Sequence, residues 1–485
     1  MSHEVQLIAY GDRLGDGTLK DLKSLLEGPL AGLFGGLHLL PFYDSISGAD
    51  AGFDPTDHLA VDPVLGDWGD VRALAAKTNL VVDLIVNHIS SHSAQFQHYL
   101  THGAHSPYAG MFLTEQQVFP GGMSDPDRQA LFVIGADDPF VECELGDGTS
   151  ERLWATFTQR QIDLNPDHHQ TEVYLDAVLT ALAKSGARRV RLDAVGFTVK
   201  TRGTSCFLTP ATFAYIDRLS RKAHALGLEV LAETHTHFER QGDVAQHVDW
   251  VYDFALGPLL LHSLFEGNSL SLKRWLAARP RNAITVLDTH DGIDVGDVAA
   301  DKLPPHRPGL LDDAAVDALV ARIHRHSGGV SARASGAAAG NVDVHQINCT
   351  YYDALGADDE AYLAARLVQL FSPGIAQIYY VGLLAGSNDV AGFARSGVGR
   401  DVNRRYYTQP EVEAELARPV VRRLMGMIRL RNHHPAFRGT FEVRPSPTHT
   451  LLLRRACEAY WAEAHVDFRA RSFTIRCSHP ETFSP

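Results

Sequence analysis

Short apolar runs alternate with helical patterns along most of the chain. Eight runs are rich in Val, Ile, Leu and aromatic residues and are bounded by polar or turn-forming residues, which is typical of strands in a parallel sheet. They lie at residues 5–10, 36–42, 80–88, 190–197, 228–235, 250–256, 283–291 and 375–382. Residues 171–186, between two of these runs, have apolar side chains three and four positions apart and end in glycine, which predicts a helix. Eight such units predict a (β/α)8 barrel, the TIM barrel fold.

Two segments are too long to be simple connections of a barrel. Residues 89–170 contain clusters of Pro, Gly and Asp and are expected to form an inserted subdomain after the third strand. Residues 292–365 form a second expected insertion after the seventh strand; their tract GGVSARASGAAAGN is either a surface loop or a mobile lid. The barrel then comprises residues 1–88, 171–291 and 366–434, and short alternating runs in residues 435–485 predict a small C-terminal β domain.

The charge balance argues against two classes of partner. The chain has 485 residues and a formal net charge of −14, whereas nucleic acids and anionic membranes require basic patches. Its apolar runs fall well short of the roughly 20 residues that a membrane span needs, and MSHEVQLIAY opens directly into a strand pattern. We therefore expect a cytoplasmic protein, monomeric or homodimeric, that acts on small molecules.

Cysteine and histidine patterns do not indicate a metal site. The five cysteines are odd in number, scattered and without CxxC spacing, so neither a disulfide framework nor a zinc site is expected. The 25 histidines include no HExxH motif. No metal and no cofactor are predicted.

The stretch VRLDAVGF, residues 190–197, places two charged residues in an apolar run. Residues two apart on a strand face the same side, so Arg191 and Asp193 share one face. Such a pair is costly to bury. It is either a structural ion pair or a carboxylate that a guanidinium keeps ionised for chemistry.

Other predicted strands also end in polar residues, as expected where a barrel carries its reactive groups. They are Asp83, Asn87 and His88 on the third strand, Glu233 on the fifth, and His290 and Asp291 on the seventh. Carboxylates, an arginine and histidines together suit cleavage of a glycosidic bond, which needs an ionised nucleophile and a protonated acid. Arg191 would keep Asp193 ionised, and the less charged context LAETH would let Glu233 stay protonated.

The motifs DLIVNH, RLDAVGF, AETH and DTHDG, in this order, resemble the four short regions of the α-amylase superfamily, glycoside hydrolase family 13. Longer segments, including YGDRLGDGTLKDL, GLHLLPFYDSISGADAGFDPTDH, QINCTYYDALG and GRDVNRRYY, resemble the sucrose phosphorylase subfamily. The resemblance covers about residues 5–433. It also implies that no calcium ion is needed.

The resemblance implies a role for each matching residue. Asp193 matches the nucleophile that forms a β-glucosyl-enzyme, Glu233 the general acid/base, and Asp291 the carboxylate that stabilises the transition state. Phosphate would then attack the intermediate and release α-glucose 1-phosphate with net retention. The residues that match substrate-binding positions are Arg191, which orients the nucleophile, His88 and His290, Asp50 and Arg400, the platform Phe53, and Gln161 and Gln346.

The chain departs from the subfamily on the acceptor side. Ile134 and Gly135 stand where sucrose phosphorylases carry a Pro-Arg pair, and His345 stands in place of a tyrosine. A histidine at this position is a feature of the sucrose 6F-phosphate phosphorylases, whose leaving group is fructose 6-phosphate, and an imidazole binds a phosphoryl group better than a phenol does. Arg152 and Arg333 are further candidate phosphate ligands. Alternatively, His345 only repacks the loop.

We therefore predict a sucrose 6F-phosphate phosphorylase that forms α-glucose 1-phosphate and fructose 6-phosphate. Plain sucrose is the second candidate substrate, and glucosylglycerol or glucosylglycerate follow. A family 13 hydrolase or transglucosylase would use the same three carboxylates. A catalytically inactive amylase-like binding subunit would lack one of them and carry a membrane anchor.

Overall fold

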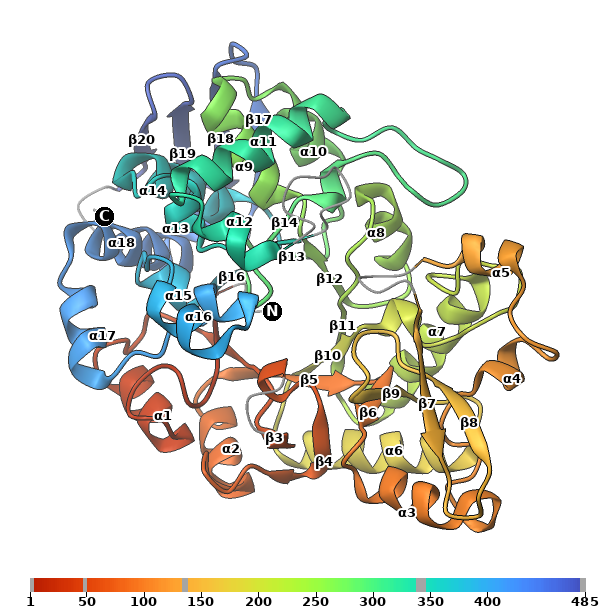
Figure 1. Ribbon diagram of the computed structural model, residues 1–485. Helices are drawn as coiled ribbons and strands as arrows, with labels where there is room; N and C mark the ends of the chain where they lie inside the picture. Colours follow the sequence, from red (N-terminus) through yellow and green to blue (C-terminus); the bar gives the residue numbers. More distant parts are fainter. Residues whose placement is uncertain (1–3, 47–49, 133–137, 337–345, 480–485) are drawn as a thin grey trace. The chain divides into compact units, whose positions relative to one another are not determined.

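The computed structural model describes residues 4–46, 50–132, 138–336 and 346–479. Each of the eight apolar runs contains a strand, and the strands, most of them labelled in Figure 1, close into a parallel barrel in the order β1-β16-β13-β12-β11-β10-β5-β2. The predicted (β/α)8 barrel is confirmed. Its strands are β1 (Gln6–Ala9), β2 (Gly36–Leu39), β5 (Asn79–Ile85), β10 (Arg189–Asp193), β11 (Glu229–Ala232), β12 (Trp250–Asp253), β13 (Ala283–Thr285) and β16 (Ile375–Tyr379).

The strands are shorter than the apolar runs that predicted them. The run 190–197, for example, leaves the sheet after Asp193 and continues as the 3₁₀ helix η3 (Val195–Phe197). Asp83, Arg191 and Asp193 lie within the last residues of β5 and β10, whereas Glu233 and Asp291 follow their strands.

Amphipathic helices connect the strands. The predicted helix 171–186 is α6 (His169–Lys184), which buries Tyr174, Leu175, Val178, Leu179 and Leu182 at helical spacing. Further helices are α1 (Leu19–Glu27), α2 (Trp68–Ala75), α7 (Pro210–Ala225), α8 (Phe238–Val244), α9 (Leu256–Glu266), α10 (Leu270–Ala278), α14 (Asp359–Phe371) and α18 (Pro419–His433).

The segment after β5, the third barrel strand, builds a small subdomain. Its antiparallel pairs are β6 with β9 and β7 with β8. A local apolar cluster that includes Phe119, Phe140 and Trp154 supports it. Its elements are β6 (His88–Ser90), α3 (Ala94–His102), η2 (Gly103–His105), α4 (Glu115–Val118), α5 (Asp125–Ala130), β7 (Phe140–Glu144), β8 (Ser150–Trp154) and β9 (Gln161–Asp163).

The segment after β13, the seventh barrel strand, contains a short antiparallel pair, β14 with β15. The tract 328–341, read as a loop or a lid, forms helix α12 over Val330–Ser335, and its residues 337–341 lie outside the described residues. The elements are β14 (Ile293–Asp294), η4 (Gly296–Val298), α11 (Asp313–His326), α12, β15 (Gln346–Ile347) and α13 (Tyr351–Ala354).

The C-terminal strands form a four-stranded antiparallel sheet in the order β17-β18-β19-β20, which confirms the predicted β domain. These strands are β17 (Thr440–Arg444), β18 (Thr450–Cys457), β19 (Tyr460–Asp467) and β20 (Ser472–Cys477). The remaining elements are β3 (Tyr43–Ser45), η1 (Asp50–Gly52), β4 (Pro55–Val61), α15 (Tyr380–Leu383), α16 (Val390–Ser396), η6 (Gly399–Asn403), α17 (Gln409–Leu416) and η7 (Pro435–Arg438).

The chain divides into two compact units, which are described separately below. One consists of residues 39–234 and 246–250, and the other of residues 1–38, 235–245 and 251–485. Within the described ranges, no helix has both the length and the apolar character needed to cross a membrane.

Candidate active site

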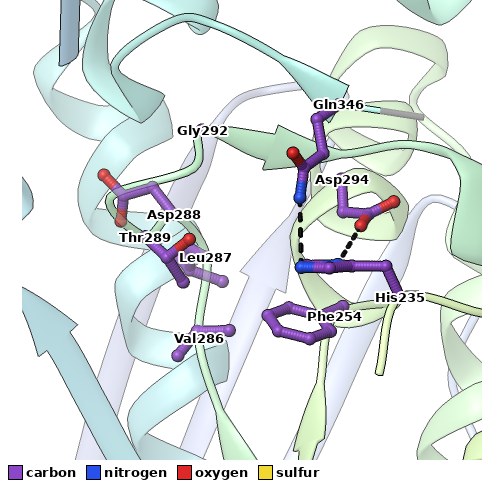
Figure 2. A pocket seen from close by; sticks show the side chains of 9 residues that line it. All are labelled: His235, Phe254, Val286, Leu287, Asp288, Thr289, Gly292, Asp294 and Gln346. Atoms are coloured by element: carbon purple, nitrogen blue, oxygen red, sulfur yellow. Dashed lines mark hydrogen bonds and ion pairs between the residues drawn. The ribbon is translucent and has the colours of Figure 1, made fainter. Parts of the chain in front are cut away.

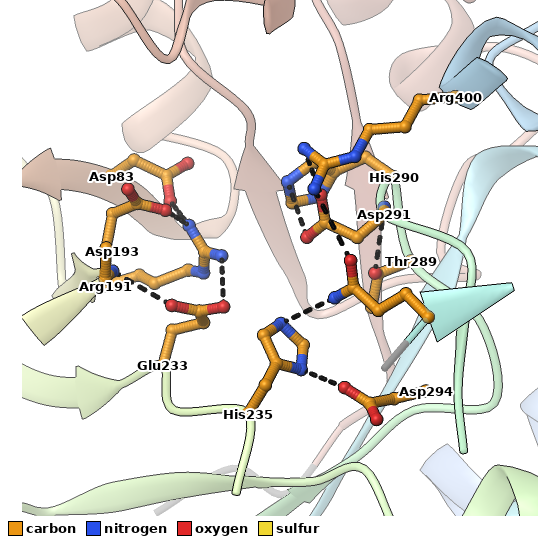
Figure 3. A network of polar contacts seen from close by, with 12 residues as sticks. Asp83, Arg191, Asp193, Glu233, His235, Thr289, His290, Asp291, Asp294 and Arg400 are labelled. Carbon is orange, nitrogen blue, oxygen red and sulfur yellow. Dashed lines mark hydrogen bonds and ion pairs between the residues drawn. The ribbon is translucent and has the colours of Figure 1, made fainter. Parts of the chain in front are cut away.

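In the unit 39–234, the buried Arg191 holds two carboxylates at the ends of neighbouring strands. Its Nη1 lies 2.5 Å from Asp83 Oδ1 and 2.8 Å from Asp193 Oδ1. Arg191 and Asp83 are register partners across β10 and β5, and Arg191 and Asp193 share a face of β10 (Figure 3). All three side chains are nearly inaccessible to solvent. Because an unpaired charge here would cost several kcal/mol, the guanidinium favours an ionised Asp193.

Glu233, which follows β11, lies against the same arginine. Its Oε1 is 3.7 Å from Arg191 Nη2, and its Oε2 accepts a hydrogen bond of 2.9 Å from the Ala194 N–H. Ala194 has a φ of +51°, a conformation that costs an alanine about 1–2 kcal/mol and is often found at functional sites. Pairing of β10 with β11 brings Arg191 near Glu233, which the local context LAETH does not show, but the arginine lies farther from Glu233 than from Asp193.

Three predicted sugar-binding residues meet at the backbone carbonyl of Phe53. His88 Nε2 lies 2.9 Å from this oxygen, and Gln161 Nε2 donates to it at 3.3 Å. The Arg191 guanidinium lies 5.5 Å from the centre of the Phe53 ring. Phe53, His88 and Gln161 are therefore placed together beside the arginine that holds Asp193.

His58, on β4, is buried near His88. Burial, helped by the neighbouring His88, lowers the pKa of its imidazole from 6.5 to about 3. The unfolded chain therefore binds a proton at His58 between pH 6.5 and about 3, where the folded protein does not. The free energy of unfolding therefore does not depend on His58 above pH 6.5. Between pH 6.5 and about 3 it falls by about 1.4 kcal/mol for each pH unit.

We expect the melting temperature of the His58→Gln variant to depend less steeply on pH between 6.5 and 4 than that of the wild type. The measurement is thermal unfolding by scanning fluorimetry at half-unit pH steps. Replacement of the exposed His102 with glutamine is the matched control and should leave the wild-type slope intact. Parallel curves for His58→Gln and the wild type would refute the assignment.

In the second unit, Asp291 follows β13 and faces several cationic or titratable groups. Its Oδ1 lies 3.0 Å from Arg400 Nη1 and 3.7 Å from Arg404 Nη2, and its Oδ2 lies 3.2 Å from His290 Nε2. Burial alone would raise the pKa of Asp291, but His290, Arg400 and Arg404 hold that pKa far below its usual value. Asp291 is therefore ionised throughout the working pH range.

The last residue of η6 and the residue after it hold the chain that carries Asp291. Arg404 Nε donates to the His290 carbonyl at 2.8 Å, and Asn403 Nδ2 donates to the Thr289 carbonyl at 3.1 Å. Arg404 is almost completely buried. The arginine that faces Asp291 thus also orients its backbone.

A small pocket beside Asp291 contains a second polar group (Figure 2). His235 stacks on Phe254 with ring centres 4.3 Å apart, and its Nδ1 contacts the carboxylate of Asp294. Gln346 Nε2 lies 3.0 Å from His235 Nε2, and Gln346 Oε1 accepts from Arg400 Nη2 at 3.4 Å. The pocket is lined by His235, Phe254, Val286, Leu287, Asp288, Thr289, Gly292, Asp294 and Gln346.

Sequence reasoning did not single out His235 or Asp294. The available signal was position: His235 comes two residues after Glu233, and Asp294 three residues after Asp291. Both were passed over because neither belongs to the set of residues that the family resemblance assigns.

Other predicted residues have different outcomes. Asp50 lies in the 3₁₀ turn η1, whereas His345, Ile134 and Gly135 lie outside the described residues. Arg152, a candidate phosphate ligand, pairs through its guanidinium with Glu115 at 2.8 Å and with Asp138. Arg333 lies exposed on α12.

One group of described residues in the second unit has the donor atoms of a cation site. Ligand atoms of His235, Asp294 and Asp297 lie within 4.8 Å of one another. Asp294 already contacts His235, and Asp297 accepts a hydrogen bond from Gln241. Contacts with other protein side chains therefore explain why these three residues lie close together, without a bound cation.

The full length of the chain is similar to known enzymes. A sucrose phosphorylase from Agrobacterium vitis is 48% identical over 99% of this chain and 98% of its own. The chain is a glycoside phosphorylase of the α-amylase family, glycoside hydrolase family 13. The family model for the α-amylase catalytic domain matches residues 11–232.

Members of this phosphorylase family differ in the sugar that they cleave. A glucosylglycerol phosphorylase from Marinobacter adhaerens is 40% identical over 99% of this chain and 98% of its own. The crystal structure of a sucrose 6F-phosphate phosphorylase from Thermoanaerobacter thermosaccharolyticum superposes with a TM-score of 0.89 at 35% identity, covering 98% of this chain and 96% of that one. Family membership therefore does not determine which leaving group this enzyme releases.

Proposed function

We propose that this phosphorylase transfers the glucosyl unit of a sucrose-type α-glucoside to inorganic phosphate by double displacement. The observation that carries the proposal is the position of Arg191, which contacts both Asp193 and Glu233. The two carboxyl groups that a retaining mechanism requires are thus held by one guanidinium at the ends of β10 and β11.

The charges around Arg191 support different roles for these groups. One guanidinium faces Asp83, Asp193 and Glu233, at 2.5, 2.8 and 3.7 Å. Carboxylates this close oppose one another's ionisation, so a proton is kept most easily by the one farthest from the cation. That group is Glu233, which we assign as the acid, and Asp193 is the nucleophile.

The reaction follows from these assignments. Asp193 attacks the anomeric carbon while Glu233 protonates the departing oxygen; phosphate then attacks the β-glucosyl-enzyme as Glu233 takes back a proton. Asp291, ionised by its cationic neighbours, stabilises the positive charge that develops at the anomeric centre. The product is α-glucose 1-phosphate.

For the glucosyl unit we assign the residues that match the family positions. They are the platform Phe53 and the hydrogen-bonding groups His88, His290, Asp50, Arg400 and Gln161. His88 and Gln161 both contact the backbone carbonyl of Phe53, which supports the assignment of these three residues to one sugar-binding site.

For the leaving group we propose fructose 6-phosphate, so that the substrate is sucrose 6F-phosphate. The supporting residue is His345, which replaces a phenol by an imidazole. Plain sucrose is the second candidate, and the 48% identity to the Agrobacterium vitis sucrose phosphorylase favours it.

The test is release of glucose 1-phosphate from sucrose and from sucrose 6F-phosphate, each with and without inorganic phosphate. We expect kcat/KM to be about 10- to 100-fold higher for the phosphorylated sugar, the effect of one or two hydrogen bonds to a charged group. In His345→Tyr this ratio should fall toward one, with plain sucrose as the internal control. Equal or better use of sucrose by the wild type would refute the proposed leaving group, and glucose release without phosphate would identify a hydrolase.

A further inference from the structure

The pair β14–β15 brings together residues that are distant in the sequence. Asp294 and Gln346 are register partners across this pair, and the imidazole of His235 contacts both of them. Gln346 also accepts a hydrogen bond from Arg400, whose other terminal nitrogen lies 3.0 Å from Asp291. These contacts, all within one unit, connect Asp294 to the carboxylate that we assign to transition-state stabilisation (Figure 3).

In the contacts that run from Arg400 through Gln346 and His235 to Asp294, chemistry decides which atom carries each proton. A guanidinium only donates, so the side of Gln346 that faces Arg400 must be its carbonyl oxygen. The amide N–H group of Gln346 then faces His235, so His235 Nε2 must accept. The single proton of a neutral imidazole is therefore on Nδ1, the nitrogen that faces Asp294.

The surroundings restrict His235 to this arrangement. Asp294 is 6% exposed, and the imidazole stacks on Phe254 at an interplanar angle of 26°. Asp297, another carboxylate close to His235, receives a hydrogen bond from Gln241. The Asp294 carboxylate is thus the group that faces Nδ1 of His235 in a site of low polarity.

We propose that Asp294 is a positioning residue for the phosphorolysis reaction. It selects the Nδ1–H tautomer of His235, His235 holds the amide of Gln346, and the amide oxygen helps to align Arg400 against Asp291. This inference rests on the proposed function, which assigns Asp291 to transition-state stabilisation and Arg400 to binding of the glucosyl unit. It goes further by assigning roles to Asp294 and His235.

Substitutions at Asp294 separate this role from a structural one. In Asp294→Leu the Nδ1–H loses its acceptor, so His235 adopts the Nε2–H tautomer and Gln346 must turn its oxygen toward the ring. Its N–H group then opposes Arg400. Asp294→Asn retains an acceptor oxygen for Nδ1–H and loses only the charge. We expect kcat/KM to fall about 10- to 100-fold in the leucine variant and only a few-fold in the asparagine variant.

The decisive kinetic experiment is a double-mutant cycle with Gln346→Ala. If Asp294 acts through Gln346, then Asp294→Leu should change kcat/KM by less than about twofold in the Gln346→Ala background. The matched control is Asp297→Leu, which removes a neighbouring buried carboxylate that contacts Gln241 instead. Its effect should be the same with and without Gln346. Equal losses in the leucine and asparagine variants, or additivity of Asp294→Leu with Gln346→Ala, would overturn the proposal.

The tautomer is measured independently of activity. In ¹⁵N-imidazole spectra of the whole protein, the signals missing from His235→Gln identify His235. We expect the neutral Nδ1–H pattern in the wild type and a change in Asp294→Leu. An Nε2–H tautomer or an imidazolium in the wild type would refute the inferred hydrogen-bond direction. If the wild type released no glucose 1-phosphate from either sugar, the proposed function would fail, while these spectra would still decide the arrangement around His235.

Discussion

Replacement of Asp193 with asparagine is expected to lower the rate of glucose 1-phosphate formation by about 10⁴-fold or more. The amide cannot form the glucosyl ester, so the double displacement has no first step. The shape of the side chain is retained, and Arg191 keeps its 2.5 Å contact with Asp83, so the fold should persist. The measurement is turnover with phosphate in excess, together with melting temperature. For the wild type with a slowly turned-over glucosyl donor, mass spectrometry should find one glucosyl unit on the peptide that contains Asp193.

Asp83→Asn is the matched control for this prediction. Asp83 contacts the same Arg191 nitrogen as Asp193 but lies on the neighbouring strand β5. If Arg191 and its carboxylates form only a structural ion pair, the two asparagine variants should lose activity and stability alike. We expect Asp83→Asn to retain glucosyl-enzyme formation, because it removes a partner of the arginine and leaves the nucleophile. Retention of near-normal turnover by Asp193→Asn would disprove the assignment.

The second large effect is expected for Glu233→Gln, and it should depend on the leaving group. With a sugar leaving group, loss of the acid should reduce the rate about 10²- to 10⁴-fold. With α-glucosyl fluoride, whose departing fluoride needs no proton, formation of the glucosyl-enzyme should be much less impaired. Glutamine still offers an oxygen to the Ala194 N–H, which Glu233 accepts at 2.9 Å, so the local backbone is preserved. Fluoride release and sugar release are measured on the same preparations.

Comparison with Asp193→Asn distinguishes the acid from the nucleophile. Loss of the nucleophile should abolish reaction with both donors, whereas loss of the acid should spare the fluoride. A Glu233→Gln variant that lost both reactions equally would contradict the acid role and would indicate that Glu233 acts mainly by orienting Arg191, from which its Oε1 is 3.7 Å.

The sequence alone was sufficient to predict the barrel and the placement of Arg191 beside Asp193. Strands such as β10 and β16 are buried on both sides, so their apolar runs are nearly continuous and are visible without any knowledge of partners. The shared face of Arg191 and Asp193 follows from the two-residue period of a strand, which is a local property of the chain. The same holds for the C-terminal strands, whose alternating pattern reflects a sheet with one buried face.

Only the tertiary structure decided which charges face each other. The register of β10 against β5 and β11 gives Arg191 contacts with Asp83 and Glu233, which the local context LAETH did not reveal. Pairing of β14 with β15 placed Gln346 opposite Asp294 across a long insertion. The physical reason is that the repeat of a strand and its apolar content depend only on neighbouring residues. The electrostatic environment of a buried group depends on strands that pack beside it from distant parts of the chain.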